Sequence, residues 1–336
     1  MSNIAGNKFI LLSKRNEFLS FVILIAVMTG FTIINPSFLT TRNMFDLLRS
    51  MIVTGIFACG VMMAMISGGV DISFMTIALC SSYLTIKLAL ASGTDWMILP
   101  LITLSALFGI VLGLCNAVLI NKFEITVFIA TLAVGTTIRG LMLKFVGNEY
   151  IPNNWMPPST INFSRFYVFN TVDSTGASYG LHFSVFIMIA LMLITHFIMR
   201  YTIIGRGIYT IGGDVVSAKR VGYNVSRVRY FLYGYSGALA GIGGMIYAAN
   251  NRMVDPMSFQ GAEMTVIAAV VLGGTSIMGG KGSMFGVFLG LMLTNVINNN
   301  LVMIGVPSYW QRLVFGILII VAVFVQSIKA KRDAGI

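Results

Sequence analysis

Long apolar segments follow one another along nearly the whole chain, and they limit its fold more than any other feature. Each approaches the roughly 17 to 25 residues that a helix needs to cross a bilayer. We count about ten such segments, at residues 18–34, 45–66, 73–91, 96–120, 126–145, 183–199, 230–249, 262–273, 284–300 and 309–328,. The eighth is too short to cross unless it continues into the glycine-rich stretch behind it. The sequence therefore predicts an all-α, polytopic membrane bundle of about ten transmembrane helices, with a membrane domain at 18–328,.

The composition agrees with a protein of the bilayer. Hydrophobic residues make up 57% of the chain and charged residues only 10%, whereas an average soluble domain is about 25% charged. The net charge of +11 could indicate a nucleic-acid partner, but the basic residues are spread over loops and form no stripe. We therefore expect membrane lipid, and no nucleic acid, as a partner. The three cysteines, Cys59, Cys80 and Cys115, lie in apolar runs without metal-binding or disulfide spacing,.

The basic residues also predict how the spans are oriented. If the N-terminus is cytoplasmic, the tails and loops on that side hold 14 of the 22 Lys and Arg residues. The positive-inside rule then places both tails, 1–17 and 329–336, and the loop 200–229 in the cytoplasm, and the loop 146–182 outside,. The basic N-terminus resembles a signal peptide, but no small-x-small cleavage site follows its apolar run, so we expect an uncleaved first span,.

A polar, basic segment, GGDVVSAKRVGYN at Gly212–Asn224, interrupts this apolar pattern inside the loop 200–229. Asp214 can cap a short helix over 215–221, and Gly222 can take the left-handed position at its C-terminal end. Such a helix would lie outside the lipid between two spans and offer polar and basic side chains to a soluble protein. The segment therefore predicts a site where force from another subunit reaches the membrane domain.

Two glycine-rich interruptions are the other candidates for function. The segment SGGVDIS (67–73) places Asp71 between apolar runs, where an unpartnered carboxylate costs at least ~2.5 kcal/mol,. Asp71 is either a pathway or gating residue, or the N-cap of the third span. The segment GGTSIMGGKGS (273–283) is not a phosphate-binding loop, because that motif needs glycine at Thr275 and a hydroxyl residue at Gly282,. Its glycines permit close packing or a broken helix beside a wet cavity.

Other features leave their alternatives open. The loop 146–182 is a cap or lid that meets an outside partner, or a solvated connector. Arg139 in the fifth span either faces the interior or snorkels outward with Lys144. The paired glycines at 109/113, 237/241 and 286/290 predict close helix packing within the chain,. The candidate pathway or gating residues are Gly68, Gly69, Asp71, Gly273, Gly274, Thr275, Asn298 and Asn299, although the asparagines also fit the outer end of the ninth span.

Four motifs carry a resemblance to a known family. IGGDVVSAKRVGYNVSRVR followed by AVVLGGTSIMGGKGS resembles the signature of the permease subunits of bacterial ABC importers of the ribose and monosaccharide family. ISGGVDIS and FIATLAVGTTIRGL are similar to that family's first-half motifs, in the same order, and the likeness extends over about 38–325. One departure is the run Ser73–Thr76, SFMT, where the family usually has a small, glycine-containing run, so this segment says nothing of the substrate.

The resemblance implies a fold, partners and a location. The fold would be the ten-span type II ABC importer fold in the bacterial inner membrane. The partners would be an ABC ATPase, which carries ATP and Mg, an extracytoplasmic sugar-binding protein, and a second permease that is identical or related; this chain would bind no cofactor. The segment Gly213–Gly222 would be the coupling helix on the ATPase, and its expected coupling residues are Gly213, Asp214, Ser217, Ala218, Lys219, Arg220 and Gly222.

The predicted function is a permease subunit that forms the pathway for a monosaccharide-like solute and takes its energy from a separate ATPase. One alternative is a permease for a nucleoside or another small metabolite. A second is an ion-coupled secondary transporter, which would need more intramembrane carboxylates than Asp71. His182 and His196 are isolated and no catalytic constellation is present, so we do not expect an enzyme,.

Overall fold

The computed structural model describes residues 16–172, 178–259 and 261–303, with isolated positions between 305 and 324. Within these residues, helices occupy the first nine expected spans. The first half contains α2 (Asn16–Ile34), the short η1 (Pro36–Leu39), α3 (Thr41–Ile66), α4 (Phe74–Ser92), α5 (Ile98–Lys122) and α6 (Val127–Leu141), which continues as a π-helical turn (Met142–Val146). The second half contains α8 (Ser184–Tyr201), α11 (Val225–Asn251), α12 (Glu263–Leu272) and α13 (Met284–Met303). The expected tenth span, 309–328, lies largely outside the described residues.

Six of the described helices are long and apolar enough to cross a membrane: α3, α4, α5, α6 with its π-helical turn, α8 and α13. The apolar parts of α2 and α12 are shorter, and α11 has 27 residues but carries two arginines in its first turns. In length and composition, these six helices agree with the sequence prediction of spanning helices.

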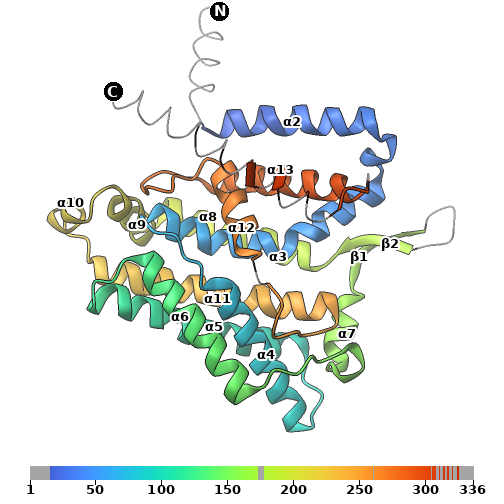
Figure 1. Ribbon diagram of the computed structural model, residues 1–336, viewed down its shortest axis with the longest axis horizontal. Coiled ribbons are helices and arrows are strands. Elements are labelled where there is room, and N and C mark those ends of the chain that lie inside the picture. Colours follow the sequence, from blue (N-terminus) through green and yellow to red (C-terminus); the bar gives the residue numbers. More distant parts are fainter. Residues whose placement is uncertain are drawn as a thin grey trace, which may run out of the picture.

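The helices pack around α3 and α11, which run through the middle of the bundle (Figure 1). On one side of them lie α2 and α13, and on the other lie α4, α5 and α6 (Figure 1). α3 is buried from Gly55 to Ile66, so that stretch contacts other helices rather than lipid. α5 and α11 approach so closely that a Cβ on Gly109 or Gly237 would overlap the facing backbone. The predicted role of the paired glycines in packing within the chain is thereby confirmed.

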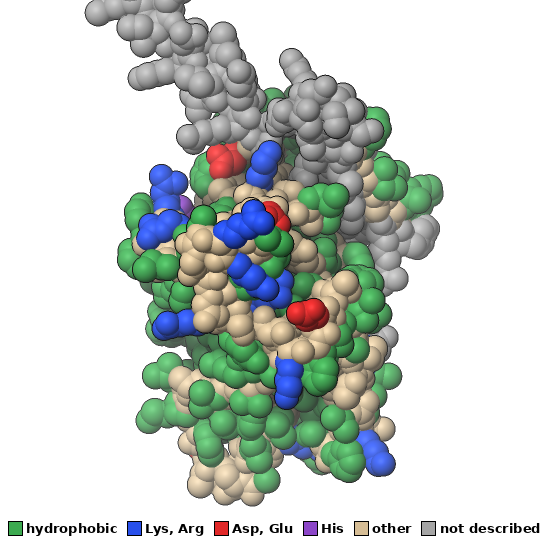
Figure 2. All heavy atoms as spheres, turned by 90° about the vertical axis from the view of Figure 1, so that its left-hand side faces the viewer, with side chains coloured by type: hydrophobic (Ala, Val, Ile, Leu, Met, Phe, Trp, Pro, Cys, Tyr) green, Lys and Arg blue, Asp and Glu red, His purple; other side chains and the backbone are tan. Residues whose placement is uncertain are grey.

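The two ends of the bundle differ in charge. The end that carries the loop 200–229 exposes many cationic side chains (Figure 2). They are Lys122, Arg200, Arg206, Lys219, Arg220, Arg227 and Lys281. The exposed acids among the described residues there are Glu124 and Asp214. This cationic end is the one that the positive-inside rule assigns to the cytoplasm.

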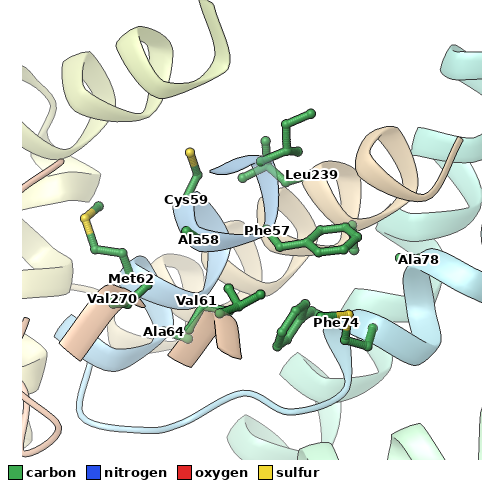
Figure 3. Packing of buried hydrophobic residues seen from close by; sticks show 14 of the residues in the cluster. Phe57, Ala58, Cys59, Val61, Met62, Ala64, Phe74, Ala78, Leu239 and Val270 are labelled. Atoms are coloured by element: carbon green, nitrogen blue, oxygen red, sulfur yellow. The ribbon is translucent and has the colours of Figure 1, made fainter. Parts of the chain in front are cut away.

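Two helices begin inside the bundle instead of at one of its ends. The ring of Phe74, the first residue of α4, lies 5.5 Å from that of Phe57 in the middle of α3 (Figure 3). The chain therefore turns back along α3 after Ile66 before α4 starts. Phe259, shortly before α12, also contacts Phe57, with ring centroids 5.8 Å apart. Both α4 and α12 thus start near the depth of Phe57, and their connecting segments arrive from opposite ends.

The loop 146–182 folds into an ordered cap at the end opposite the cationic one. Its described part holds a short 3-10 helix (Asn153–Trp155), α7 (Pro158–Ser164) and an antiparallel hairpin of β1 (Tyr167–Val172) and β2 (Ser178–His182). The all-α prediction is therefore wrong for this loop, which contains two short strands. The loop is tied to the bundle because Arg252 Nε donates to Ser164 Oγ at 2.7 Å and Ile151 pairs with Val254.

His182 fixes the junction between this cap and α8. Its Nδ1 accepts the Ser184 N–H at 3.2 Å, so the neutral ring carries its proton on Nε2, which donates to the Phe163 carbonyl at 3.1 Å,. Burial, and then the charge of Arg49, lower the pKa of His182 below its usual value. The neutral imidazole is therefore the form that this junction requires.

Candidate functional site

The loop 200–229 forms two helices at the cationic end. α9 (Ile203–Gly213) begins at Thr202, whose hydroxyl accepts the Gly205 N–H at 3.1 Å. α10 (Val215–Arg220) follows after Asp214. The sequence prediction missed α9. Its signals were Thr202 as a capping residue and isoleucines at helical spacing, at 204, 208 and 211,.

α10 is the short helix that the sequence predicts, one residue shorter than expected. The Asp214 carboxylate accepts the backbone N–H groups of Val216 at 3.2 Å and Ser217 at 2.7 Å. The Ser217 side chain, then the backbone N–H groups of Ser217 and Val216, lower the pKa of Asp214 below its usual range by hydrogen bonding, so the cap is charged at neutral pH. Gly222 has φ +89°, the left-handed conformation in which a side chain would be strained,. Local signals alone therefore account for both ends of α10.

The exposed face of α10 is mixed apolar and cationic. Val216 is 54% exposed, and Ser217, Lys219 and Arg220 are exposed beside it. Ala218, another of the expected coupling residues, is fully buried. Its side chain therefore packs against the bundle and is not available to a partner. Gly213, Asp214 and Gly222 are exposed at the two ends of the helix. A partner would thus meet an apolar and cationic surface with little acidic charge.

Glycines connect α9 to two distant parts of the chain, and we call this contact the glycine junction: Gly68, Gly212, Gly279 and Gly280. A Cβ on Gly212 would overlap the carbonyl oxygen of Ile66, at the end of α3, and would lie 2.7 Å from Gly280 N. The Cα of Gly68 lies 2.9 Å from the position a Cβ on Gly279 would take. Three backbones therefore touch without side chains between them, which only glycine allows.

Hydrogen bonds reinforce the glycine junction. Gly280 N donates to the Ile66 carbonyl at 2.9 Å, and the Tyr209 hydroxyl of α9 donates to the Gly282 carbonyl at 2.8 Å. Ser283 donates to Glu17 at the start of α2. The end of α9 is thus fixed to the end of α3 and to the segment between α12 and α13. The sequence contained these glycines, but only the tertiary structure shows that they meet.

The four glycines among the candidate pathway residues also lie at the cationic end. Gly68 has φ +94°, and Gly69 lies against Val127 at the start of α6. Gly273 and Gly274 line a cavity of about 280 Å³ together with Arg200, Lys281 and Glu17. The neighbouring Thr275 is buried, and its hydroxyl has no hydrogen-bond partner within the described structure. These residues lie around the glycine junction.

Asp71 is buried and its carboxylate is used within its own segment. It accepts the backbone N–H of Ser73 at 2.8 Å and the Ser73 hydroxyl at 2.7 Å. Asn116 of α5 donates to the same hydroxyl at 2.7 Å. The carboxylate therefore holds the turn that leads into α4. This arrangement is close to the helix-start interpretation, although Ser73, not Asp71, occupies the N-cap position.

Asn298 and Asn299 lie elsewhere, half-buried near the end of α13. Asn299 Nδ2 donates to the Ser50 hydroxyl of α3 at 3.3 Å, and that hydroxyl bonds Asn295 Oδ1 at 3.2 Å. These side chains join α3 to α13. The two asparagines therefore do not lie near the candidate glycines at the cationic end.

Arg139 lines a cavity of about 280 Å³ between the starts of α4 and α12. Glu263, the first residue of α12, lines the same cavity together with the hydroxyl residues Thr76, Thr131 and Thr136. Lys144 instead is exposed and lies 5.2 Å from the Phe145 ring centroid. Arg139 is half-buried in this lining, whereas Lys144 is not part of it. Among the described residues, no cluster of His, Cys, Asp and Glu could hold a metal ion.

Comparisons with known proteins agree on one class of molecule. Residues 43–323 match the protein family described as branched-chain amino acid transport system / permease component. The chain is 30% identical to the ribose import permease of Haemophilus influenzae, over 96% of this chain and 95% of the relative. It is 33% identical to the ribose import permease of Bacillus subtilis, over 95% and 94%, and 27% identical to the xylose transport system permease of Haemophilus influenzae, over 93% and 96%. No solved structure matches the chain.

Proposed function

The chain belongs to the family of transport-system permease components, and within it to the ABC sugar permeases of the ribose type; from this premise we propose that it is the membrane subunit of an ATP-driven, binding-protein-dependent importer. Its solute is a monosaccharide or a similar polyhydroxylated molecule. The observation that carries the proposal is the likeness to ribose and xylose permeases over more than nine tenths of the chain. In this proposal the chain adopts the ten-span type II importer fold, with both termini in the cytoplasm.

In this proposal energy enters at α10. A separate ATPase binds Val216, Ser217, Lys219 and Arg220, and closure of the ATPase around ATP and Mg displaces the helix. The exposed cationic surface supports this role, because an apolar centre with positive charges fits a soluble partner better than lipid,. The glycine junction then passes the displacement to the end of α3 and to the segment behind α12. In this proposal the chain itself binds neither ATP nor a cofactor.

The remaining partners complete the pathway. A second permease, identical to this chain or related to it, encloses the pathway, and a binding protein delivers the solute at the capped end. The cap of α7, β1 and β2 supports this assignment because it is an ordered surface, joined to the end of α11 by the hydrogen bond from Arg252 to Ser164. A rigid surface of this kind suits repeated docking of a protein.

Reconstitution tests the proposal. Proteoliposomes that hold this chain with the ATPase of the same importer, and with its binding protein outside, should accumulate radiolabelled ribose or xylose only when ATP is inside. An excess of unlabelled sugar should compete, and an excess of a nucleoside should not. Accumulation by the chain alone, or accumulation driven by an ion gradient without ATP, would contradict the proposal and support an ion-coupled transporter instead.

A further inference from the structure

A cavity of about 500 Å³ opens between α3, α11 and α12 in the half of the bundle nearest the cap. Its volume lies within the range of about 300 to 1,000 Å³ that is usual for small-molecule sites. The cavity is lined on α3 by residues that share one face at helical spacing, from Asp46 and Arg49 through Thr54 to Phe57,. It therefore extends from the capped end to the depth at which α4 and α12 start.

Aromatic rings form the inner wall of the cavity. The ring of Phe259 packs edge-on against Phe57, with centroids 5.8 Å apart, and lies 4.3 Å from the ring of Tyr247. Phe259 has φ +68°, a backbone conformation that is strained for a bulky residue,. Such strain persists only where surrounding contacts hold it, and it concentrates at ligand sites and switch regions. The bundle thus holds the backbone of one aromatic residue in an unfavourable conformation at this wall.

Polar groups of both charges form the rest of the lining. Asp46 and Arg49 offer an acceptor and donors, and their charges balance,. The Arg49 guanidinium is held in place because it donates to the Tyr167 hydroxyl of the cap at 3.0 Å and lies 5.8 Å from that ring's centroid. The side-chain oxygen of Asn250 has no hydrogen-bond partner in the described structure. A lining with no net charge, several hydrogen-bonding groups and an aromatic face fits a neutral, polyhydroxylated solute better than an ion.

We propose that this cavity is the part of the translocation pathway that binds the solute, with hydroxyl groups of a monosaccharide on Asp46, Arg49 and Asn250 and its ring face against Phe259. The inference rests on the proposed function and adds where the sugar contacts the permease. The sugar binds weakly in this cavity, because it must leave the pathway again. Phe259 then acts as a platform whose strained backbone makes it sensitive to movement of α12.

Substitutions of the platform test the inference in the reconstituted complete importer. Phe259→Leu should lower sugar uptake by about two- to tenfold, because it removes the aromatic face, whereas Phe259→Tyr should retain most of the uptake. Phe186→Leu, at an exposed position of α8, is the matched control and should transport as the unaltered chain does. Uptake by Phe259→Leu equal to that of Phe186→Leu would overturn the inference while leaving the proposed function intact. An unaltered complex that transports no monosaccharide would refute the proposed function, and the inference with it.

Cysteine labelling tests the cavity even where a platform variant fails to fold. In a chain whose native cysteines are replaced by alanine, Thr54→Cys should react from outside with a water-soluble, membrane-impermeant thiol reagent, and labelling should stop uptake. Thr29→Cys, exposed on the apolar helix α2, is the control and should react much more slowly. If Thr54→Cys does not react, or reacts without any loss of uptake, the cavity is not part of the pathway.

Discussion

A methyl group at Gly212 should break the glycine junction. A Cβ there would overlap the Ile66 carbonyl oxygen and lie 2.7 Å from Gly280 N, and both neighbours are backbone atoms that cannot rotate away. The added methyl group would lie against both the Ile66 oxygen and the Gly280 nitrogen, which are hydrogen-bonded to each other at 2.9 Å. If these two atoms move apart by about 1 Å to make room for it, their hydrogen bond exceeds the usual range of about 2.7–3.2 Å. Overpacking and one unsatisfied backbone group together cost about 2 to 5 kcal/mol.

The neighbouring glycine provides a matched control for this change. A Cβ on Gly213 would have no atom within 4 Å, and the residue has no positive φ, so Gly213→Ala should change the free energy of unfolding by less than about 0.5 kcal/mol,. Thermal unfolding of both variants in the same detergent measures the difference. Gly212→Ala should melt several degrees below Gly213→Ala.

Transport separates a stability effect from a coupling effect. In the reconstituted importer at a temperature where both variants stay folded, Gly212→Ala should hydrolyse ATP with little sugar uptake, because α9 no longer contacts α3 in the same way. Gly213→Ala should lower the ratio of uptake to hydrolysis much less, because its methyl group meets no other atom. Equal melting temperatures and equal ratios for the two variants would refute the reasoning about the glycine junction.

Three further predictions concern α10, the cap and the helix packing. Replacing Ser217 and Arg220 together by glutamate should abolish ATP-driven uptake while membrane insertion and thermal stability stay unchanged; normal uptake would count against an ATPase site on α10. Because burial lowers the pKa of His182 below its unfolded value of about 6.5,, its contribution to stability is complete above about pH 6.5 and declines as the pH falls. The melting temperature should therefore drop between pH 7.5 and pH 5.5 (roughly one unit to either side of that pKa) and should drop less in His182→Gln; an equal drop in both would exclude this residue. Gly237→Ala should destabilise the bundle by about 1 to 3 kcal/mol because its Cβ meets backbone,. Gly234→Ala should be nearly neutral, because its Cβ meets only side-chain atoms, of which the nearest is 3.5 Å away on Leu114; similar melting temperatures would contradict this difference.

Features that depend on local chemistry could be predicted from the sequence. An aspartate before a short run of helix-forming residues and a glycine after it define α10, and both signals act within a few residues. Hydropathy likewise locates the spans, because each segment must be apolar over the thickness of the membrane. The packing of Gly237 against Gly109 follows the same logic, since small residues at four-residue spacing permit close approach.

Features that depend on depth or on distant contacts could not be predicted. Hydropathy does not distinguish a segment that ends at the interface from one that turns back inside the bundle, so the starts of α4 and α12 near Phe57 were not expected. The glycine junction joins segments that are far apart in the sequence, and no local pattern shows that Gly212 meets Ile66. The hairpin of β1 and β2 consists of strands too short to stand out within a polar loop.

α4 and α12, the two helices that begin inside the bundle, lie with their connecting segments between the cationic end and the cavity. Under the proposed function, they are the elements through which a displacement of α10 would reach the solute. α12 has 10 residues and is therefore about 15 Å long,; one end leads to the glycine junction through Gly273 and Gly280, and the other begins beside Phe259. On the opposite side, the segment 67–73 runs from Gly68 in the junction to the start of α4, next to Phe57. Phe57 and Phe259 touch each other. A movement at the glycine junction therefore reaches the contact between Phe57 and Phe259 from both α12 and the segment 67–73. If α12 and this segment moved in opposite directions, the inner wall of the cavity would open or close.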